Sequence, residues 1–136
     1  MSRIFVGLTV LACAVGGCER RGQIDSRAVV RKALRGTLAY PRSTLVSMTS
    51  GSDAGQLELT SPDAVETVAR WFRVALPMNG WQLESDAKAG DGTVSIYAQQ
   101  GSKPLWITLK PNVGAPGTTY TMIGAAIDST KTDSVR

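Results

Sequence analysis

Histidine is absent from the 136 residues, and both cysteines, Cys13 and Cys18, lie within the first 18. Histidine is the commonest general base and the commonest metal ligand in proteins. The body of the chain also has no thiol, so its core must be stable without a disulfide. The two absences remove residues on which many acid–base and metal sites depend.

Two short patterns resemble catalytic or metal-binding motifs but lack the residues that such motifs need. Ser85 and Lys88 match S-x-x-K of penicillin-recognising enzymes, but the S-D-N and K-T-G elements are missing. Asp86 and Asp91 do not follow the alternating ligand spacing of an EF-hand, which also ends in a glutamate. No P-loop and no dinucleotide fingerprint occurs. We therefore expect no enzymatic activity, no cofactor and no metal.

Only one long hydrophobic run is present, the stretch Ile4–Gly17 of apolar and small residues with a single threonine. Its 14 residues fall short of the about 20 that a membrane-spanning helix needs. Arg3 is the one charged residue before Cys18. A short basic start, a short apolar segment and a small-residue end are typical of a secretory signal peptide, which we predict over residues 1–17.

The end of this stretch, Val15-Gly16-Gly17-Cys18, resembles the lipobox of bacterial lipoproteins. In that family the cysteine thiol is diacylated and a peptidase cuts just before it. The resemblance implies that Cys18 becomes the N-terminus and carries acyl chains that anchor it in a membrane. Three alternatives stay open: lipidation of Cys13 in a second lipobox, cleavage at Ala12-Cys13-Ala14 that releases a soluble secreted protein, or no processing.

Positive charge is concentrated just behind the predicted anchor. Residues 20–42 carry seven basic side chains and one acid, whereas residues 43–136 carry seven basic and nine acidic ones. Residues 26–39 have the spacing of an amphipathic helix, with Arg27, Arg31 and Arg35 as a cationic stripe. The stripe either contacts an anionic lipid surface or is a solvated face of a helix packed on the domain. Nucleic acid is not expected as a partner, because no recognition motif accompanies the charge.

The remaining pattern predicts one α+β domain over residues 40–127. We expect an antiparallel sheet in β-β-α-β-β-β-β order with one main helix packed on one face. Ser61 and Pro62 mark the start of that helix, and Pro77 and Gly80 mark its end. The basic helix would belong to a tether over residues 18–39, and residues 128–136 to a disordered tail. The predicted strands are 44–50, 56–60, 81–85, 93–99, 105–109 and 118–127.

Three aromatic residues in the predicted strands are candidates for a surface that binds a partner. Strand alternation places Trp106 away from the apolar side of its strand, and Tyr97 lies opposite the apolar residues of its own strand. Together with Tyr120, they would form an aromatic patch on an open sheet face. Alternatively, the three rings pack under the N-terminal helix.

Three motifs resemble a small domain that is frequent in bacterial envelope proteins and lipoproteins. They are Tyr40-Pro41, the helix start Ser61-Pro62-Asp63 and the helix exit Leu76-Pro77-Met78-Asn79-Gly80-Trp81. These motifs are structural, so the resemblance implies no catalytic residue. A looser similarity is to the helix-grip domains of lipoproteins that assist outer-membrane protein assembly, and it implies only a fold.

These patterns favour a non-catalytic, lipid-anchored lipoprotein of the bacterial cell envelope, on the periplasmic or extracellular side of a membrane. Its domain would bind an envelope protein partner or have a structural role. The alternative is a module that binds a small apolar or peptide ligand between helix and sheet. A cavity larger than about 300 Å³ there would favour the ligand. A flat sheet face with an exposed Trp106 would favour the protein partner.

The lipobox generates the first testable prediction. Cys18→Ser removes the thiol that accepts the lipid, so metabolic labelling with a palmitate analogue should fail and an unprocessed precursor should accumulate. Cys13→Ser serves as the matched control and should keep the label. Label that persists in the Cys18→Ser protein would move the anchor to Cys13 or to another residue.

Overall fold

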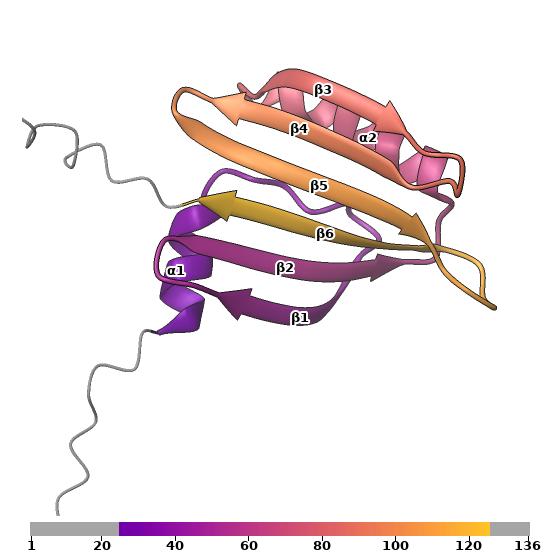
Figure 1. Cartoon of the computed structure of the whole chain (residues 1–136), viewed down its shortest axis with the longest axis horizontal. Helices are drawn as coiled ribbons and strands as arrows, with labels where there is room; N and C mark the ends of the chain where they lie inside the picture. Colours follow the sequence, from indigo (N-terminus) through magenta and orange to yellow (C-terminus); the bar gives the residue numbers. More distant parts are fainter. Residues whose placement is uncertain (1–24, 126–136) are drawn as a thin grey trace, which may run out of the picture.

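The computed structural model describes residues 25–125, which form a six-stranded sheet and two helices (Figure 1). The α+β class and the antiparallel sheet are confirmed. In chain order the elements are α1 (Ser26–Ala33), β1 (Thr44–Ser50), β2 (Ala54–Ser61), α2 (Val65–Met78), β3 (Gln82–Lys88), β4 (Val94–Gln100), β5 (Lys103–Pro111) and β6 (Thr118–Ala125).

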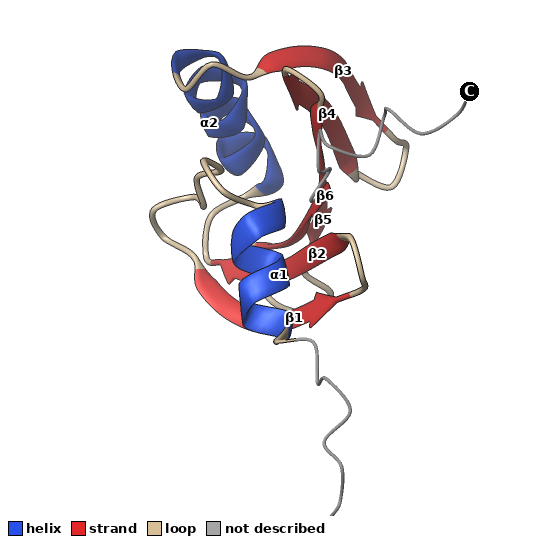
Figure 2. Cartoon of the chain, turned by 90° about the vertical axis from the view of Figure 1, so that its left-hand side faces the viewer, coloured by secondary structure: helices blue, strands red, loops and turns tan. Residues whose placement is uncertain are grey.

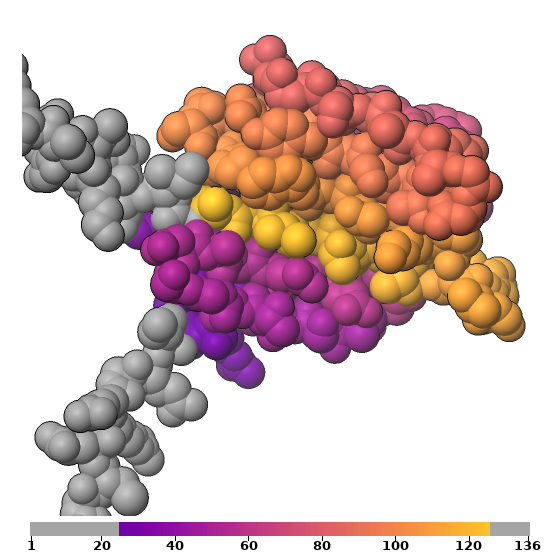
Figure 3. Space-filling model, in the orientation of Figure 1, coloured from indigo at the N-terminus to yellow at the C-terminus, as the bar shows by residue number. Residues whose placement is uncertain are grey.

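The strands lie in the order β1-β2-β6-β5-β4-β3, and every neighbouring pair is antiparallel. Strands β3 to β6 form a meander, as their short connections predict. Both helices lie on the same side of the sheet, α1 over β1, β2 and β6 and α2 over β3, β4 and β5 (Figure 2). Within residues 25–125, no helix covers the other side (Figure 3). Two helices thus share the face on which the sequence predicts one main helix.

Helix α1 is shorter than predicted and is part of the domain. The Asp25 carboxylate accepts a hydrogen bond from the Arg27 amide and caps the start. The helix ends at Ala33 instead of Ala39, because Gly36 turns the backbone into the left-handed region at φ +81°. Its apolar side chains Val30 and Leu34 are buried in the main core. The segment predicted as part of a tether therefore contributes to folding.

Helix α2 begins three residues later than its expected first residue, Pro62. Ala64 is its N-cap residue, and the Ser61 hydroxyl instead accepts a hydrogen bond from the Asp63 amide in the preceding turn. The helix does not end at Pro77. This proline lies in the last turn, and the helix continues to Met78. The chain leaves the helix at Gly80, whose φ is +81°.

Strand alternation buries one side chain in two along the central strands, and these residues form the core together with the helices. In β1, plain alternation over residues 44–50 would place Val46 and Met48 on one side, and this expectation is wrong. A bulge between Leu45 and Ser47 shifts the register, so that Leu45 and Met48 lie opposite Leu59 and Leu57. The fully buried large side chains include Phe72, Val94, Ile96, Leu105, Ile107, Leu109, Tyr120 and Met122.

Two glycines that face each other across β2 and β6 form the seat of α1. Gly55 and Gly124 are paired in the sheet register and both are buried. A Cβ atom on Gly55 would lie 2.7 Å from the Val30 Cα, and one on Gly124 would lie 2.5 Å from the Ala33 carbonyl oxygen. The helix backbone therefore rests directly on the strand backbone, which any side chain here would prevent.

This close approach predicts that adding one methyl group will disturb the domain. Gly55→Ala and Gly124→Ala should each lower the free energy of unfolding by about 1–3 kcal/mol, because α1 must move away from the sheet. Gly51→Ala is the control, since a Cβ there meets no atom within 4 Å. Urea unfolding monitored by circular dichroism measures the three variants. Equal stability of all three would contradict the glycine seat.

Candidate functional site

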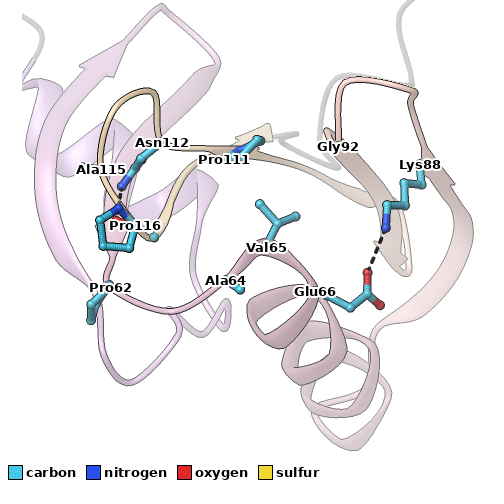
Figure 4. Close-up of a pocket in the computed structure, with 11 residues that line it drawn as sticks. Pro62, Ala64, Val65, Glu66, Lys88, Gly92, Pro111, Asn112, Ala115 and Pro116 are labelled. Carbon is cyan, nitrogen blue, oxygen red and sulfur yellow. Dashed lines mark hydrogen bonds and ion pairs between the residues drawn. The ribbon is translucent and has the colours of Figure 1, made fainter.

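A cavity of about 560 Å³ opens at the end of the sheet where α2 begins (Figure 4). Its walls come from three segments: the first turn of α2, the turn between β3 and β4, and the loop between β5 and β6. Most of the lining atoms belong to apolar or small residues, and polar groups lie at one side. The lining residues are Pro62, Ala64, Val65, Glu66, Lys88, Gly92, Pro111, Asn112, Ala115, Pro116 and Gly117.

The loop between β5 and β6 is held in shape by Asn112. Its backbone amide donates to the Gly117 carbonyl at 3.0 Å, and its side-chain amide donates to the Pro116 carbonyl at 3.3 Å. The Thr119 hydroxyl donates to the Asn112 side-chain oxygen at 2.7 Å. Gly117 has φ +110° and lies against the Ser61 carbonyl, where a Cβ would overlap it. This loop is therefore a shaped wall of the cavity.

An ion-pair network forms the polar side of the cavity. Glu66 binds the Lys88 ammonium at 3.6 Å and the Arg73 guanidinium at 2.9 Å. Arg73 also makes two hydrogen bonds to Asp86 through separate nitrogens. The hydrogen bond from Arg73 is the main cause that lowers the pKa of Glu66, and Lys88 adds to it. The carboxylate is thus ionised at neutral pH, and Lys88 is its one partner that lines the cavity.

Behind the cavity, Asp63 fixes the turn that connects β2 to α2. Its carboxylate accepts a hydrogen bond from the Tyr40 hydroxyl at 2.6 Å and pairs with Arg42 at 3.0 Å. Its carbonyl accepts a hydrogen bond from the Thr118 hydroxyl at 2.8 Å. The hydrogen bond to Asp63 is also the main cause that raises the pKa of Tyr40. Two of the motifs singled out in the sequence, Tyr40-Pro41 and Ser61-Pro62-Asp63, therefore meet in one structural contact.

Tyr120 belongs to this contact and not to an exposed surface, which corrects the prediction from the sequence. Its ring is fully buried on the helix-covered face and packs edge-on against Phe72, with 5.5 Å between ring centroids. Its hydroxyl accepts a hydrogen bond from the Tyr40 amide at 3.0 Å and shares another with Ser43 at 2.7 Å. Burial is the main cause that raises the pKa of Tyr120.

Tyr97 and Trp106 do lie on the open face of the sheet. They are cross-strand partners in β4 and β5, and their rings stack with centroids 5.2 Å apart. Trp106 is 44% exposed. Along β4 and β5, these two rings are separated from Gly92 and Pro111, which line the cavity. The ring pair and the cavity are therefore two separate candidate surfaces.

The three arginines of the stripe are exposed, Arg27 and Arg31 on α1 and Arg35 just after its end, and they line a second, separate groove beside β1. They do not contribute to the cavity at α2. Cys13 and Cys18 lie outside the described residues. Sequence reasoning missed the cavity, because its walls come from segments that are distant along the chain. The available signal was the group of turn residues Pro62, Pro111 and Pro116 at strand ends.

Within residues 25–125, no group of three or more acidic, histidine or cysteine side chains is placed to hold a metal ion. No helix in this part of the chain is long and apolar enough to cross a membrane.

Comparison with known proteins gives one match. A family model described as START domain-like matches residues 42–125, which span all six strands and α2. No curated protein and no solved structure matches the chain.

The buried hydroxyl of Tyr120 generates a prediction. Tyr120→Phe removes the acceptor of the Tyr40 amide and should lower the free energy of unfolding by about 1–2 kcal/mol. Tyr97→Phe is the control, because its hydroxyl, which accepts from Gln99, lies on the open face where water replaces it. Urea unfolding measures both variants. A Tyr120→Phe protein as stable as the control would show that the contact at Tyr40 does not stabilise the fold.

Proposed function

We propose that this chain, which belongs to the START domain-like family, is a non-catalytic ligand-binding module. We further propose that the cavity at the start of α2 is its binding site. This proposal takes up the alternative that the sequence left open and moves the site from the space between helix and sheet to the start of α2.

The cavity is the observation that carries the proposal. Its volume of about 560 Å³ falls within the range of pockets that hold small molecules, about 300–1,000 Å³. The shaped loop at Asn112 and the fixed turn at Asp63 support two of its walls. A site with walls held in this way needs little ordering when a ligand enters, which favours affinity.

The space between α2 and the sheet is filled by side chains of the protein itself. Val68 and Phe72 of α2 have no exposed surface, and Leu76 has almost none. Trp71 contacts both Tyr40 and Phe72 edge-on, with centroids 5.6 and 5.0 Å apart. A ligand between this helix and the sheet would have to displace the core, whereas the cavity at the helix start is open without any rearrangement.

The lining indicates the class of ligand. The apolar walls at Val65, Pro111 and Pro116 suit a ligand with an apolar body. The charges on Glu66 and Lys88 partly neutralise each other, so the rim favours a neutral or zwitterionic polar group over one with a strong net charge. We infer a small amphipathic ligand, or an apolar side chain of a peptide.

For the cellular setting we propose a lipoprotein of the bacterial cell envelope, anchored through Cys18. The lipobox resemblance and the basic segment that follows it support this. A protein partner is the second candidate for the domain's binding activity. The stacked pair of Tyr97 and Trp106 on the uncovered face favours it, because exposed stacked aromatics are enriched at protein interfaces.

The cavity is tested by filling it. Val65→Trp should weaken binding of small amphipathic molecules, because the indole would occupy the space that the ligand needs. A fragment library screened by NMR should shift the methyl signals of Ala64, Val65 and Ala115 in the wild-type protein. Each confirmed fragment is then titrated against the variant, where its affinity should fall at least about tenfold.

Val74→Trp is the matched control, because Val74 lies on the same helix, is 57% exposed and does not line the cavity. This variant should bind the fragments as the wild type does. Fragments that shift only signals near Trp106 would contradict the cavity and favour the open face as the binding surface.

A further inference from the structure

The second groove lies between α1 and the edge of the sheet. Its floor consists of Val30 and Leu34 from the helix, Met48 from β1 and Leu57 from β2. The space measures about 400 Å³ and its surface is almost entirely apolar. It is separate from the cavity at α2, with which it shares no residue.

The rim of this groove is strongly cationic. Arg27, Arg31 and Arg35 line one side of it, and no acidic residue lines it. All three arginines are exposed, and among residues 25–125 none of them forms an ion pair with an acidic side chain. A groove with an apolar floor and an unneutralised arginine rim complements a surface that is both apolar and anionic.

Apolar surface continues from the groove floor onto β1, which is an edge strand. The bulge at Val46 places both Leu45 and Met48 on the helix-covered face, beyond the cover that α1 provides. Leu45, Val46 and Met48 are 51%, 55% and 37% exposed. Exposed apolar side chains grouped on an edge strand in this way favour a binding surface for a protein or a membrane.

The groove is rigid at its helical side. The seat at Gly55 and Gly124 fixes the position of α1 against the sheet. At the end of the helix, the Trp81 indole donates to the Gly36 carbonyl at 3.2 Å, and the Lys103 ammonium donates to the Arg35 carbonyl. The arginine stripe is thus held in one orientation relative to the β1 edge.

We propose that this surface docks the domain on an anionic phospholipid membrane. The arginines contact lipid phosphates, while the groove floor and the β1 edge contact the upper acyl region. The membrane is favoured over an acidic peptide by the proposed anchor at Cys18, on which this step rests. Six residues separate Cys18 from Asp25, and the seven steps along the chain span at most about 25 Å, so the start of α1 stays close to the bilayer.

Hydrogen exchange of the full-length protein in nanodiscs tests the docking. The discs contain phosphatidylcholine alone or mixed with phosphatidylglycerol. Amides of residues 44–50 and of α1 should exchange more slowly in the anionic discs, and high salt should remove the difference. Each of the three arginines should raise the ratio of docked to undocked protein about fivefold on an anionic surface. This ratio should therefore be about 100-fold higher in anionic discs than in neutral discs.

Two pairs of matched variants locate the surface. Arg27→Gln/Arg31→Gln should lower the odds of docking about 30-fold, whereas Arg70→Gln/Lys110→Gln, which removes two exposed charges elsewhere, should not change them. Met48→Gln should weaken docking, whereas Met78→Gln, at an exposed methionine of α2, should not. Circular dichroism verifies that each variant is folded.

Equal protection in neutral and anionic discs, or none in either, would overturn the proposal. Protection of the same amides by an acidic peptide, with none in discs, would assign the groove to a protein partner. Protection that rises with protein concentration in detergent alone would assign it to a second copy. Intact mass reports lipid attachment separately, and fragment binding reports the cavity, so failure of either earlier proposal is distinguishable from failure of docking.

Discussion

The direct contact of α1 with two facing glycines is the constraint on which the rest of the structure depends. Because Gly55 and Gly124 carry no side chain, α1 lies close enough to cover β1, β2 and β6, and α2 covers the other strands on the same face. The seam between the two helix regions is closed by edge-on contacts that link Tyr40, Trp71, Phe72 and Tyr120. One face of the sheet thus holds the entire core, and the other remains open.

Because each helix covers only part of this face of the sheet, space remains at two places that neither helix reaches. Helix α2 starts only at Val65. In front of its first turn, the loops at Gly92 and Asn112 enclose the cavity. Helix α1 ends its cover short of Met48, which leaves the groove beside β1. Both candidate sites are therefore consequences of helix length. The filled interface under α2 results from the large side chains that stabilise a domain of this size without disulfides.

The antiparallel sheet follows from the sequence, whereas the helix ends, the register of β1 and the cavity do not. Period-two alternation and turn residues were sufficient to predict the antiparallel sheet, since both depend on neighbours in the chain. The length of α1 was overestimated because apolar spacing continues past Gly36, whose left-handed backbone stops the helix. The prediction that Tyr120 lies on the open face is wrong, since Tyr120 shares the buried side of β6 with Met122, while Thr119 and Thr121 lie on the other side. The cavity could not be predicted, because its walls meet only in the folded chain.

Helix α1 and the cavity-forming loops lie at opposite ends of the sheet in Figure 1, and the β1 edge runs from the cavity end toward α1. If the arginine rim at α1 rests on a bilayer, the cavity lies at the far end of the sheet from this contact. A ligand would then enter from the aqueous compartment and not laterally from the membrane. The mixed charge of Glu66 and Lys88 at the rim fits that setting, because an ion pair is stable in contact with water but costly against acyl chains. Docking and ligand binding are thus compatible in one orientation of the domain.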